Sequence, residues 1–396
     1  MNAPTRLIEV QSAMVDLTLD GKHIQAYEGE TIFKAAQRHG VDIPHLCFQD
    51  GLRADGNCRA CVVEVKGERV LAPSCCRNVA SGMEVQTRSE RALKSQKMVV
   101  EMLLSDMPEV GHKWTDGLAR KDPHPNPLPQ AGESRGEGLS APTIGQHGEL
   151  SQWATKLNVT VRPALKALRR QQPKSDISHP AMAVNLDACI QCNRCVRACR
   201  EAQVNDVIGY ALRGSHSRIV FDLDDAMGES TCVACGECVQ ACPTGALMPK
   251  TQVGSQIVDK KIDSVCPFCG VGCLLTYNVK DNKIVSVDGR DGPANHSRLC
   301  VKGRFGFDYA HSPQRLTVPL IRKVGVAKDP ELLNHLNRDT ADWSTVFREA
   351  TWEEALALTG GKLSSLREAH GPKSLAGFGS AKGSNEEAYL FQKLVR

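Results

Sequence analysis

The chain alternates apolar and polar residues in several short stretches, and this pattern predicts much of its secondary structure. Residues 14–27 alternate on both sides of Asp20-Gly21, which predicts a β-hairpin. Apolar side chains then recur with helical spacing from residue 30 to 40, and Gly40 predicts the end of that helix. Residues 61–75 hold two further apolar runs and predict a second hairpin. The N-terminal region is therefore expected to combine a small sheet with one helix.

A second region has two helical patterns separated by a stretch rich in proline and glycine. Apolar positions predict helices over 91–107 and 148–159. Residues 121–148, where the second helical pattern begins, are dense in Pro, Gly and polar residues, which predicts a flexible insertion. Scattered loop histidines are more often solvated than metal-bound, so no site is assigned to the three in or near this insertion: His112, His124 and His147.

The remaining pattern predicts two more hairpins and two more helices. The hairpins are expected over 203–224 and 274–290. Residues 351–371 predict a helix that Thr351 caps, with Glu354 three residues on completing a capping box. A short strand, a Gly/Ser-rich loop and a final helix are expected in the residues that follow.

The composition is that of an ordinary soluble globular protein. Of 396 residues, 41% are hydrophobic and 24% are charged, and the length suits roughly two to four domains. The net charge of +4 gives no reason to expect nucleic acid or an anionic membrane as partner. No apolar run approaches the ~18 residues that span a bilayer, and the N-terminal sequence has no cationic flank leading into an apolar core. We therefore expect a cytoplasmic protein, in a reducing compartment where thiols stay free.

The seventeen cysteines carry the chemistry, because most of them fall in closely spaced groups. Two runs share the spacing C-x2-C-x2-C-x3-C: Cys189, Cys192, Cys195 and Cys199, then Cys232, Cys235, Cys238 and Cys242. Short CxxC loops let several soft thiolates converge on one metal centre. A pair of zinc knuckles or a disulfide framework does not explain three cysteines at two-residue gaps, a fourth after three more residues, and the repetition of the whole pattern.

These two runs resemble the bacterial two-cluster ferredoxins, and Pro243 follows the second run as it does in that motif. In that family three closely spaced thiolates hold one [4Fe–4S] cluster and the fourth reaches across to the other. The resemblance implies that one cluster is held by Cys189, Cys192, Cys195 and Cys242. It implies that the other cluster is held by Cys232, Cys235, Cys238 and Cys199.

An earlier group has the spacing C-x10-C-x2-C-x13-C: Cys47, Cys58, Cys61 and Cys75. With the predicted hairpins and helix, it resembles the β-grasp [2Fe–2S] domain of respiratory complex I large subunits, iron-only hydrogenases and soluble NAD-dependent formate dehydrogenases. Cys76 adjoins Cys75, and only one of the two can be the fourth ligand. The family pattern around this position matches Cys75, so Cys76 is expected to be a spare thiol. A structural zinc site is the alternative, and the hairpin context makes it the weaker one.

In those families, the next helix leads into a cluster held by one histidine and three cysteines. No cysteine occurs here between Cys76 and Cys189, so we expect that cluster to be absent. We therefore expect the two-cluster ferredoxin region to form the main electron path. The [2Fe–2S] domain is then expected to act as an alternative docking contact.

The last group has the spacing C-x2-C-x3-C-x26-C: Cys266, Cys269, Cys273 and Cys300. Spacing alone would also suit a four-cysteine zinc ribbon. The tail Cys300-Val-Lys-Gly-Arg-Phe-Gly resembles the N-terminal cluster domain of the molybdenum and tungsten bis-pterin oxidoreductases. That resemblance implies that Lys302 relays electrons between a [4Fe–4S] cluster and a pterin. The Gly/Ser-rich loop near the C-terminus resembles one that approaches a pterin guanine dinucleotide in this family, and the implied contacts are Gly379, Ser380, Lys382, Ser384 and Asn385.

The order of these segments matches the α subunit of soluble NAD-dependent formate dehydrogenase. The resemblance implies a multidomain α+β protein with five parts. These are a β-grasp [2Fe–2S] ferredoxin-like domain (1–90), a degenerate histidine-cluster domain (91–178), a two-[4Fe–4S] ferredoxin domain (179–255), a [4Fe–4S] domain of the molybdenum/tungsten oxidoreductases (256–320) and the beginning of the α/β molybdopterin-binding domain (321–396).

The same resemblance implies a function. Formate would be oxidised to CO2 at a molybdenum bis(molybdopterin guanine dinucleotide) centre. Electrons would leave through three [4Fe–4S] clusters and one [2Fe–2S] cluster to a flavin- and NAD-binding β subunit, with a small [2Fe–2S] γ subunit as a further partner. The family's metal-ligating cysteine or selenocysteine would follow Arg396, so we expect a fragment or a truncated product that is inactive alone. The alternative is a non-catalytic iron–sulfur module, or a protein like the complex I large subunit, that lacks molybdenum.

Overall fold

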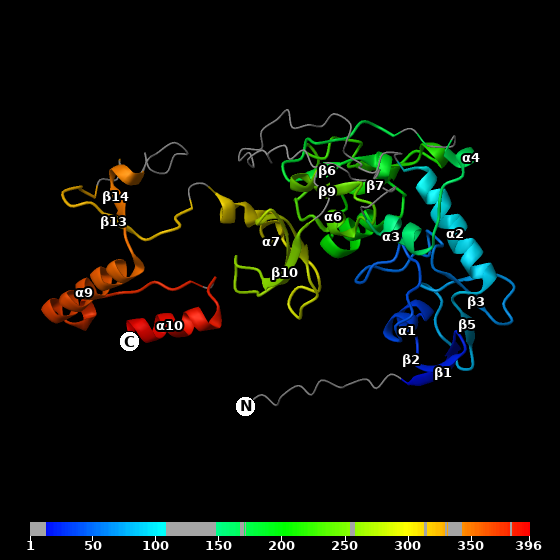
Figure 1. Cartoon of the computed structure of the whole chain (residues 1–396), viewed down its shortest axis with the longest axis horizontal. Coiled ribbons are helices and arrows are strands. Elements are labelled where there is room, and N and C mark those ends of the chain that lie inside the picture. Colours follow the sequence, from blue (N-terminus) through cyan, green and yellow to red (C-terminus); the bar gives the residue numbers. More distant parts are fainter. Residues whose placement is uncertain are drawn as a thin grey trace, which may run out of the picture.

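The computed structural model describes residues 13–107, 148–166, 170, 172–253, 258–312, 315–328, 331, 343–380 and 382–396. The chain runs from a small N-terminal sheet, through helices and two short two-stranded sheets, to a three-stranded sheet and a C-terminal segment with two longer helices (Figure 1). Among these residues, no helix is both long and apolar enough to cross a membrane. The predicted insertion lies almost entirely outside the described residues, as do its histidines His112, His124 and His147.

The N-terminal part is a five-stranded sheet in the order β2-β1-β5-β3-β4. Its strands are β1 (Met14–Leu19), β2 (Lys22–Tyr27), β3 (Val62–Val65), β4 (Ala72–Pro73) and β5 (Glu84–Gln86). β1 and β2 form the predicted antiparallel hairpin, and β3 and β4 form the second. Asp20 and Gly21 turn the first hairpin, because both adopt the positive φ that such a tight turn requires. β1 also pairs in parallel with β5, which joins the two ends of this part.

Helix α1 (Ile32–Arg38) packs on this sheet as its apolar pattern predicts. The helix begins where Thr31 Oγ1 accepts the main-chain N–H of Lys34 at 3.3 Å. It ends just before Gly40, whose φ of +74° suits glycine. The buried face of α1 shares one apolar core with side chains from β1, β3 and β5.

The next two predicted helices pack together beside the sheet. They are α2 (Glu90–Ser105) and α3 (Glu149–Lys156), and the short helix α4 (Pro163–Lys166) follows. Ser89 caps α2 by accepting the N–H of Ala92 at 3.2 Å. The buried Gln96 on α2 donates to the carbonyl oxygens of Val62 and Thr87, so α2 is fixed to the sheet by hydrogen bonds as well as by apolar contact.

The start of α3 is held against a distant part of the chain. The N–H of Glu149 donates to the carbonyl oxygen of Pro243 at 2.7 Å. Gly148 precedes it with a φ of +94°, and a Cβ at this position would lie 2.3 Å from that same carbonyl oxygen. Glycine is therefore required at residue 148 for both its conformation and the close approach.

The middle of the chain contains two small two-stranded antiparallel sheets and several short helices. β6 (Met182–Val184) pairs with β9 (Leu247–Pro249), and β7 (Ile208–Ala211) pairs with β8 (Arg218–Phe221) in the predicted hairpin. The helices are α5 (Arg194–Arg197), a π-helical turn η2 (Ala198–Gln203) and α6 (Glu237–Ala241). We call this part, residues 179–253, the two-run region, because both cysteine runs lie in it.

A three-stranded antiparallel sheet follows, with strands β10 (Lys260–Val265), β11 (Leu274–Lys280) and β12 (Lys283–Gly289). β11 and β12 form the predicted hairpin, and both residues of its turn, Asp281 and Asn282, have positive φ. The short helix α7 (Val301–Phe305) packs against β12.

The C-terminal segment consists of the strand pair β13 (Leu320–Arg322) and β14 (Phe347–Glu349), followed by α9 (Trp352–His370) and α10 (Asn385–Val395). Thr351 caps α9 as predicted, accepting the N–H of Glu354 at 3.2 Å. The other half of the expected capping box does not form, because the Glu354 carboxylate pairs with Arg348 instead.

The strand expected before the Gly/Ser-rich loop is also missing. Residues 375–380 have no regular secondary structure, because no neighbouring strand in the described part of the chain pairs with them. A complete capping box stands at the next helix instead, where Ser384 and Glu387 each bond the other's main-chain N–H at the start of α10.

A buried histidine stabilises the start of β6. His179 Nδ1 accepts the N–H groups of Ala181 at 3.1 Å and Met182 at 3.2 Å, which requires an unprotonated nitrogen. Burial, followed by the charge of nearby Lys250, lowers the pKa of His179. The folded chain therefore favours the neutral ring more strongly than the unfolded chain does.

We expect the chain to lose stability as the pH falls below ~6.5, the usual value for an unfolded histidine. Because the folded pKa is the lower one, this contribution is complete above the unfolded pKa and is lost as pH falls through the folded pKa. In His179→Asn an amide oxygen replaces the ring acceptor and does not titrate, so the fall in Tm over this range should become shallower. The exposed His216→Asn is the control. Equal pH slopes for wild type and His179→Asn would contradict the role of the ring.

Candidate metal centres

The first cysteine group comes together between the N-terminal sheet and α3. Cys47, Cys61 and Cys75 are buried and Cys58 is half-buried. The N–H of Cys58 donates to Cys47 Sγ at 3.4 Å. The neighbouring thiols of Cys58 and Cys75 lower the pKa of Cys47, and Cys47 in turn raises the pKa of Cys58. The structure thus brings all four predicted sulfur donors into one hydrogen-bonding group.

Of the adjacent pair Cys75 and Cys76, only Cys75 belongs to that group. Cys75 is fully buried, and hydrogen bonds to Cys47 and Cys61 raise its pKa. Cys76 is exposed, although the two sulfur atoms lie 3.6 Å apart. The geometry favours Cys75 as the fourth ligand, and the ligand assignment stays a prediction.

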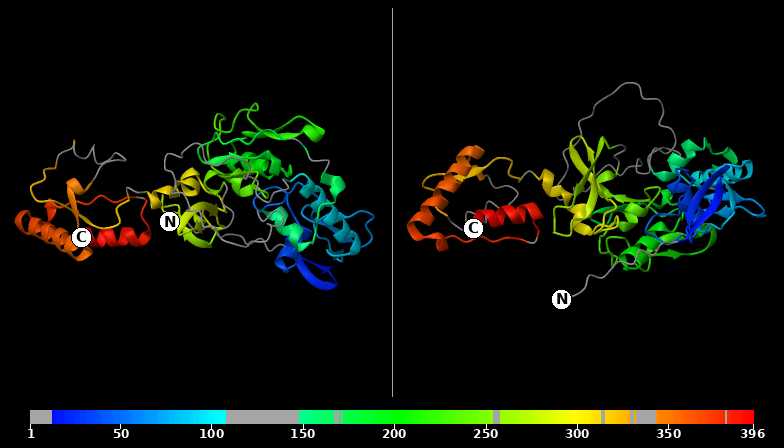
Figure 2. Two further views of the ribbon diagram at one scale, coloured as in Figure 1. Left: turned by 45° about the horizontal axis from the view of Figure 1, so that its top comes forward. Right: turned by 90° about the horizontal axis from the view of Figure 1, so that it is seen from below.

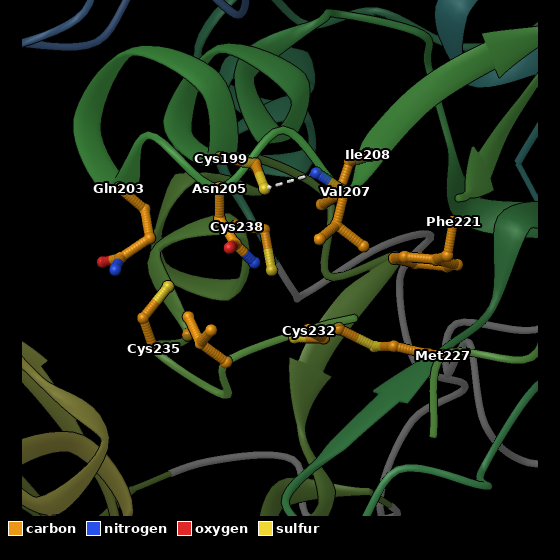
Figure 3. A pocket seen from close by; sticks show the side chains of 12 residues that line it. Cys199, Gln203, Asn205, Val207, Ile208, Phe221, Met227, Cys232, Cys235 and Cys238 are labelled. Carbon is orange, nitrogen blue, oxygen red and sulfur yellow. Dashed lines mark hydrogen bonds between the residues drawn. The ribbon is translucent and has the colours of Figure 1, made fainter. Parts of the chain in front are cut away.

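The two runs enclose a first cavity that draws on both of them (Figure 3). Its cysteines are Cys199, Cys232, Cys235 and Cys238. The apolar part of the lining includes Val207, Ile208, Phe221 and Met227. The N–H of Val207 donates to Cys199 Sγ at 3.4 Å. One cysteine of the first run therefore faces three of the second across an apolar space.

A second cavity shows the reciprocal arrangement. Its cysteines are Cys189, Cys192, Cys195 and Cys242. Apolar side chains complete the wall, among them Leu186, Ile190, Ile219 and Leu247. Each run thus gives three cysteines to one cavity and one to the other, which is the arrangement that shared ligation of two clusters requires.

The backbone of the two runs repeats the same unusual conformation. Gln191 and Ala234 occupy equivalent positions and have φ of +53° and +57°, while Asn193 and Gly236 have φ of +68° and +72°. The N–H of Gln191 donates to Cys189 Sγ, and the N–H of Ala234 donates to Cys232 Sγ, both at 3.4 Å. Left-handed residues cost energy outside glycine, and here they turn main-chain donors toward sulfur.

Burial disfavours the thiolate form of several cysteines in these cavities. Burial raises the pKa of Cys189 to about 11 and that of Cys192 to about 12. Burial also raises the pKa of Cys195 and Cys238 well above the usual value. Metal binding at these thiols would therefore release protons, since the thiolate is the ligand.

The fourth group is more open. Cys266 is buried and Cys273 half-buried, while Cys269 and Cys300 are exposed. The N–H of Cys266 donates to the carbonyl oxygen of Cys273 at 2.9 Å. Burial raises the pKa of Cys266, and the neighbouring Cys300 and Cys269 raise it further. The predicted relay Lys302 lies on α7, two residues after Cys300, and its side chain is exposed.

The predicted pterin contacts lie together in and just after an exposed loop before α10. They are Gly379, Ser380, Lys382, Ser384 and Asn385. The N–H of Lys382 donates to Ser380 Oγ at 3.1 Å, and Ser384 Oγ accepts the N–H of Glu387 at 3.2 Å. The hydroxyl of Ser384 is thus already used as a helix cap.

Sequence reasoning missed three buried arginines at the boundaries between these sites: Arg194, Arg197 and Arg304. Arg194 Nη1 donates to Glu149 Oε2 at 2.7 Å and to the carbonyl oxygen of Leu46 at 3.3 Å. It therefore ties the two-run region to both α3 and the first cysteine group. Their positions in the sequence could have indicated a role, because each of these arginines lies between the cysteines of a site or shortly after the last of them.

The first cysteine group packs directly on the two-run region. Cys47 and Cys192 belong to one apolar cluster that also contains Ile190 and Trp153. Asn57 Nδ2 donates to the carbonyl oxygen of Gln191 at 3.0 Å. The N-terminal sheet, α2 and the two-run region lie side by side in both views of Figure 2.

The donor sets fit iron–sulfur chemistry. Soft thiolate ligands select iron–sulfur clusters, zinc or copper(I) over hard cations, and all seventeen cysteines are free of disulfide bonds. Within the described ranges, no three or more Cys, His, Asp or Glu side chains are arranged to hold a single metal ion.

Four protein-family models match the chain in the predicted order. A 2Fe-2S iron-sulfur cluster binding domain matches residues 12–90, and a 4Fe-4S dicluster domain matches residues 188–246. A molybdopterin oxidoreductase Fe4S4 domain matches residues 259–312, and the molybdopterin oxidoreductase family matches residues 315–396.

Curated relatives extend the likeness over nearly the whole chain. The α subunit of NADPH-Fe(3+) oxidoreductase from Geobacter sulfurreducens is 30% identical over 97% of this chain and 39% of its own length. The putative formate dehydrogenase YrhE of Bacillus subtilis is 28% identical over 98% of this chain and 39% of its own length. The chain thus spans about two fifths of the length of these relatives.

A solved structure, the NAD+-reducing [NiFe]-hydrogenase in the H2-reduced state, is 24% identical with a TM-score of 0.49, covering 63% of this chain and 92% of that chain. The family matches and the cysteine geometry lead to one conclusion. The chain carries a 2Fe-2S domain, a 4Fe-4S dicluster domain, a molybdopterin oxidoreductase Fe4S4 domain and a segment that matches the molybdopterin oxidoreductase family.

Proposed function

We propose that the chain is the iron–sulfur electron-transfer portion of an NAD-dependent formate dehydrogenase α subunit. The observation that carries this proposal is the pair of cavities in the two-run region, each lined by three cysteines of one run and one of the other. A cysteine group on either side of this region adds a further site.

The protein would supply sulfur ligands, burial and main-chain hydrogen bonds at each site. The first group would hold a [2Fe–2S] cluster, and the other three sites would hold [4Fe–4S] clusters, which take up and release single electrons. Gln191, Ala234 and Val207 would each donate a main-chain N–H to a ligand sulfur. Such bonds set the reduction potential of iron–sulfur sites.

The packing of the first group changes its proposed role. Cys47 and Cys192 share an apolar cluster, and Asn57 is hydrogen-bonded to Gln191. This direct contact supports a place for the [2Fe–2S] site on the electron path itself, rather than as an alternative docking contact. A histidine-ligated cluster is then not needed to join the two sites.

The finer assignments rest on the relatives' names and on the family resemblance. One relative is named as an α subunit and another as a putative formate dehydrogenase. We therefore propose formate as substrate, a molybdenum bis(molybdopterin guanine dinucleotide) centre, a flavin- and NAD-binding β subunit and a small [2Fe–2S] γ subunit as partners. Free, buried thiols support a reducing, cytoplasmic location.

A second function is an electron-transfer module that lacks molybdenum. It is favoured by the contrast between the enclosed cysteine cavities and the exposed loop of predicted pterin contacts, in which Ser384 Oγ is used as a helix cap.

Metal analysis of the anaerobically purified chain tests the proposal. We expect about fourteen iron atoms per chain, from three [4Fe–4S] clusters and one [2Fe–2S] cluster. Zinc in place of iron would sink the iron–sulfur function. Iron at this level without molybdenum would support the electron-transfer module instead of the catalytic α subunit.

Formate is tested separately on a preparation that contains molybdenum. Formate should bleach the visible absorbance of the iron–sulfur clusters under argon, and acetate, a carboxylate without a transferable hydride, is the matched control. Bleaching by dithionite but not by formate would remove formate as substrate and leave the iron–sulfur function in place.

The choice between the adjacent cysteines gives a further prediction. Cys75→Ser should abolish the [2Fe–2S] signal in EPR of the reduced chain and lower the iron content by about two atoms, because the buried thiol is the proposed ligand. Cys76→Ser should keep both. A normal [2Fe–2S] signal in Cys75→Ser together with its loss in Cys76→Ser would reverse the assignment.

A further inference from the structure

Arg197 crosses the boundary between the two-run region and the first cysteine group. It lies on α5 between Cys195 and Cys199, and only 2% of its surface is exposed. Its two terminal nitrogens donate to the main-chain carbonyl oxygens of Arg53 and Cys47. A ligand position of the neighbouring site thus receives a hydrogen bond from a buried positive charge.

Asp55 balances this charge. Arg197 Nε lies 3.1 Å from Asp55 Oδ2, and Asn193 Nδ2 donates to the same oxygen at 3.0 Å. The Asp55 side chain is 14% exposed, so the pair sits in a region of low dielectric.

Arg304 repeats this arrangement at the next boundary. It lies on α7, four residues after Cys300, and is also 2% exposed. Its Nε donates to the carbonyl oxygen of Cys235 at 2.9 Å. Its Nη2 bonds to Glu237 Oε1 and its Nη1 to Gln240 Oε1, both at 2.7 Å.

One position of the repeated cysteine motif lies next to a different arginine in each run. Gly236 is equivalent to Asn193 in the other run. A Cβ on Gly236 would lie 2.1 Å from Arg304 Cδ, so glycine admits the arginine there. At Asn193 the side chain instead bonds to Asp55, the partner of Arg197.

These two arginines share features that an ordinary structural ion pair does not need. Each lies on a helix next to the cysteines of one site and donates to the main chain of a cysteine in the next site. A cation bonded to a ligand residue stabilises the reduced, more negative state of a bound cluster and raises its reduction potential. Burial strengthens this effect, because little water screens the charge.

We propose that Arg197 and Arg304 are positioning residues that set the reduction potential of the neighbouring site. Arg197 acts on the cluster held by Cys47, Cys58, Cys61 and Cys75. Arg304 acts on the cluster held by Cys199, Cys232, Cys235 and Cys238. This inference rests on the proposed binding of iron–sulfur clusters.

Potentiometric titrations of the cluster-loaded chain, followed by EPR, test the proposal. Arg197→Met should shift the oxidised-to-reduced ratio of the [2Fe–2S] cluster at least tenfold toward the oxidised form, which is ~59 mV for one electron. Arg304→Met should do the same for the [4Fe–4S] cluster of its own site. Each substitution should leave the potential of the other's cluster unchanged.

Matched variants separate tuning from folding. Arg200→Met removes an exposed arginine on the same stretch of helix, paired with Asp206, and should shift neither potential. Arg197→Lys and Arg304→Lys keep the charge but lose the planar fork, so each should give a smaller shift at the same cluster. Arg197→Met/Asp55→Asn should recover part of the shift, because it removes the negative charge that Arg197 no longer offsets.

The outcomes are distinct. A wild-type chain without iron–sulfur EPR signals would overturn the proposed function, and this inference with it. Wild-type potentials in both loaded Met variants, or equal shifts of every cluster in each, would overturn this inference alone. If a Met variant fails to take up iron, the Lys variant decides: a shift confined to its own cluster supports the proposal, and an unchanged potential overturns it.

Discussion

The burial of thiols in apolar surroundings is the constraint on which the rest of the structure depends. A thiolate is costly in such a place, and the cavities of the two-run region accordingly raise the pKa of Cys189 and Cys192 to about 11 and about 12. The fold must therefore bring donors to the sulfur atoms from its own main chain. It does so with left-handed residues at equivalent places in the two runs, such as Gln191 and Ala234.

The same constraint explains why charged side chains bridge neighbouring cysteine sites. Arg197 and Arg304 are almost completely buried, yet each has a carboxylate partner and a main-chain carbonyl acceptor. A buried ion pair is weak evidence of stability, because desolvation opposes the attraction. These ion pairs fix the position of one site relative to the next, because a guanidinium with hydrogen bonds on several sides permits only one arrangement.

Local patterns in the sequence predicted local structure well. The hairpin at Asp20-Gly21 and the helix before Gly40 follow from turn chemistry and apolar spacing, which act within a few residues. The four cysteine groups were also visible, because their ligands are spaced for short loops. The sharing of cysteines between runs came from family resemblance, and the structure shows cavities with that lining.

What the sequence could not reveal depends on distant partners. Glu354 looked like half of a capping box, but Arg348 competes for its carboxylate. Arg304 looked like part of a motif tail, and its partner Glu237 lies far away in the sequence. A short strand was predicted before the Gly/Ser-rich loop, but strand formation depends on pairing with another segment, and no single segment encodes its partner.

The anchoring of α3 has a consequence for the length of the segment before it. Met107 packs in the apolar cluster around Cys47 and Cys192, and the N–H of Glu149 is bonded to Pro243. Both flanks of the segment 108–147 are thus fixed independently of its length. The entropy of closing a loop grows only with the logarithm of its length. A change in the number of residues between these two anchors should therefore cost either neighbouring site little.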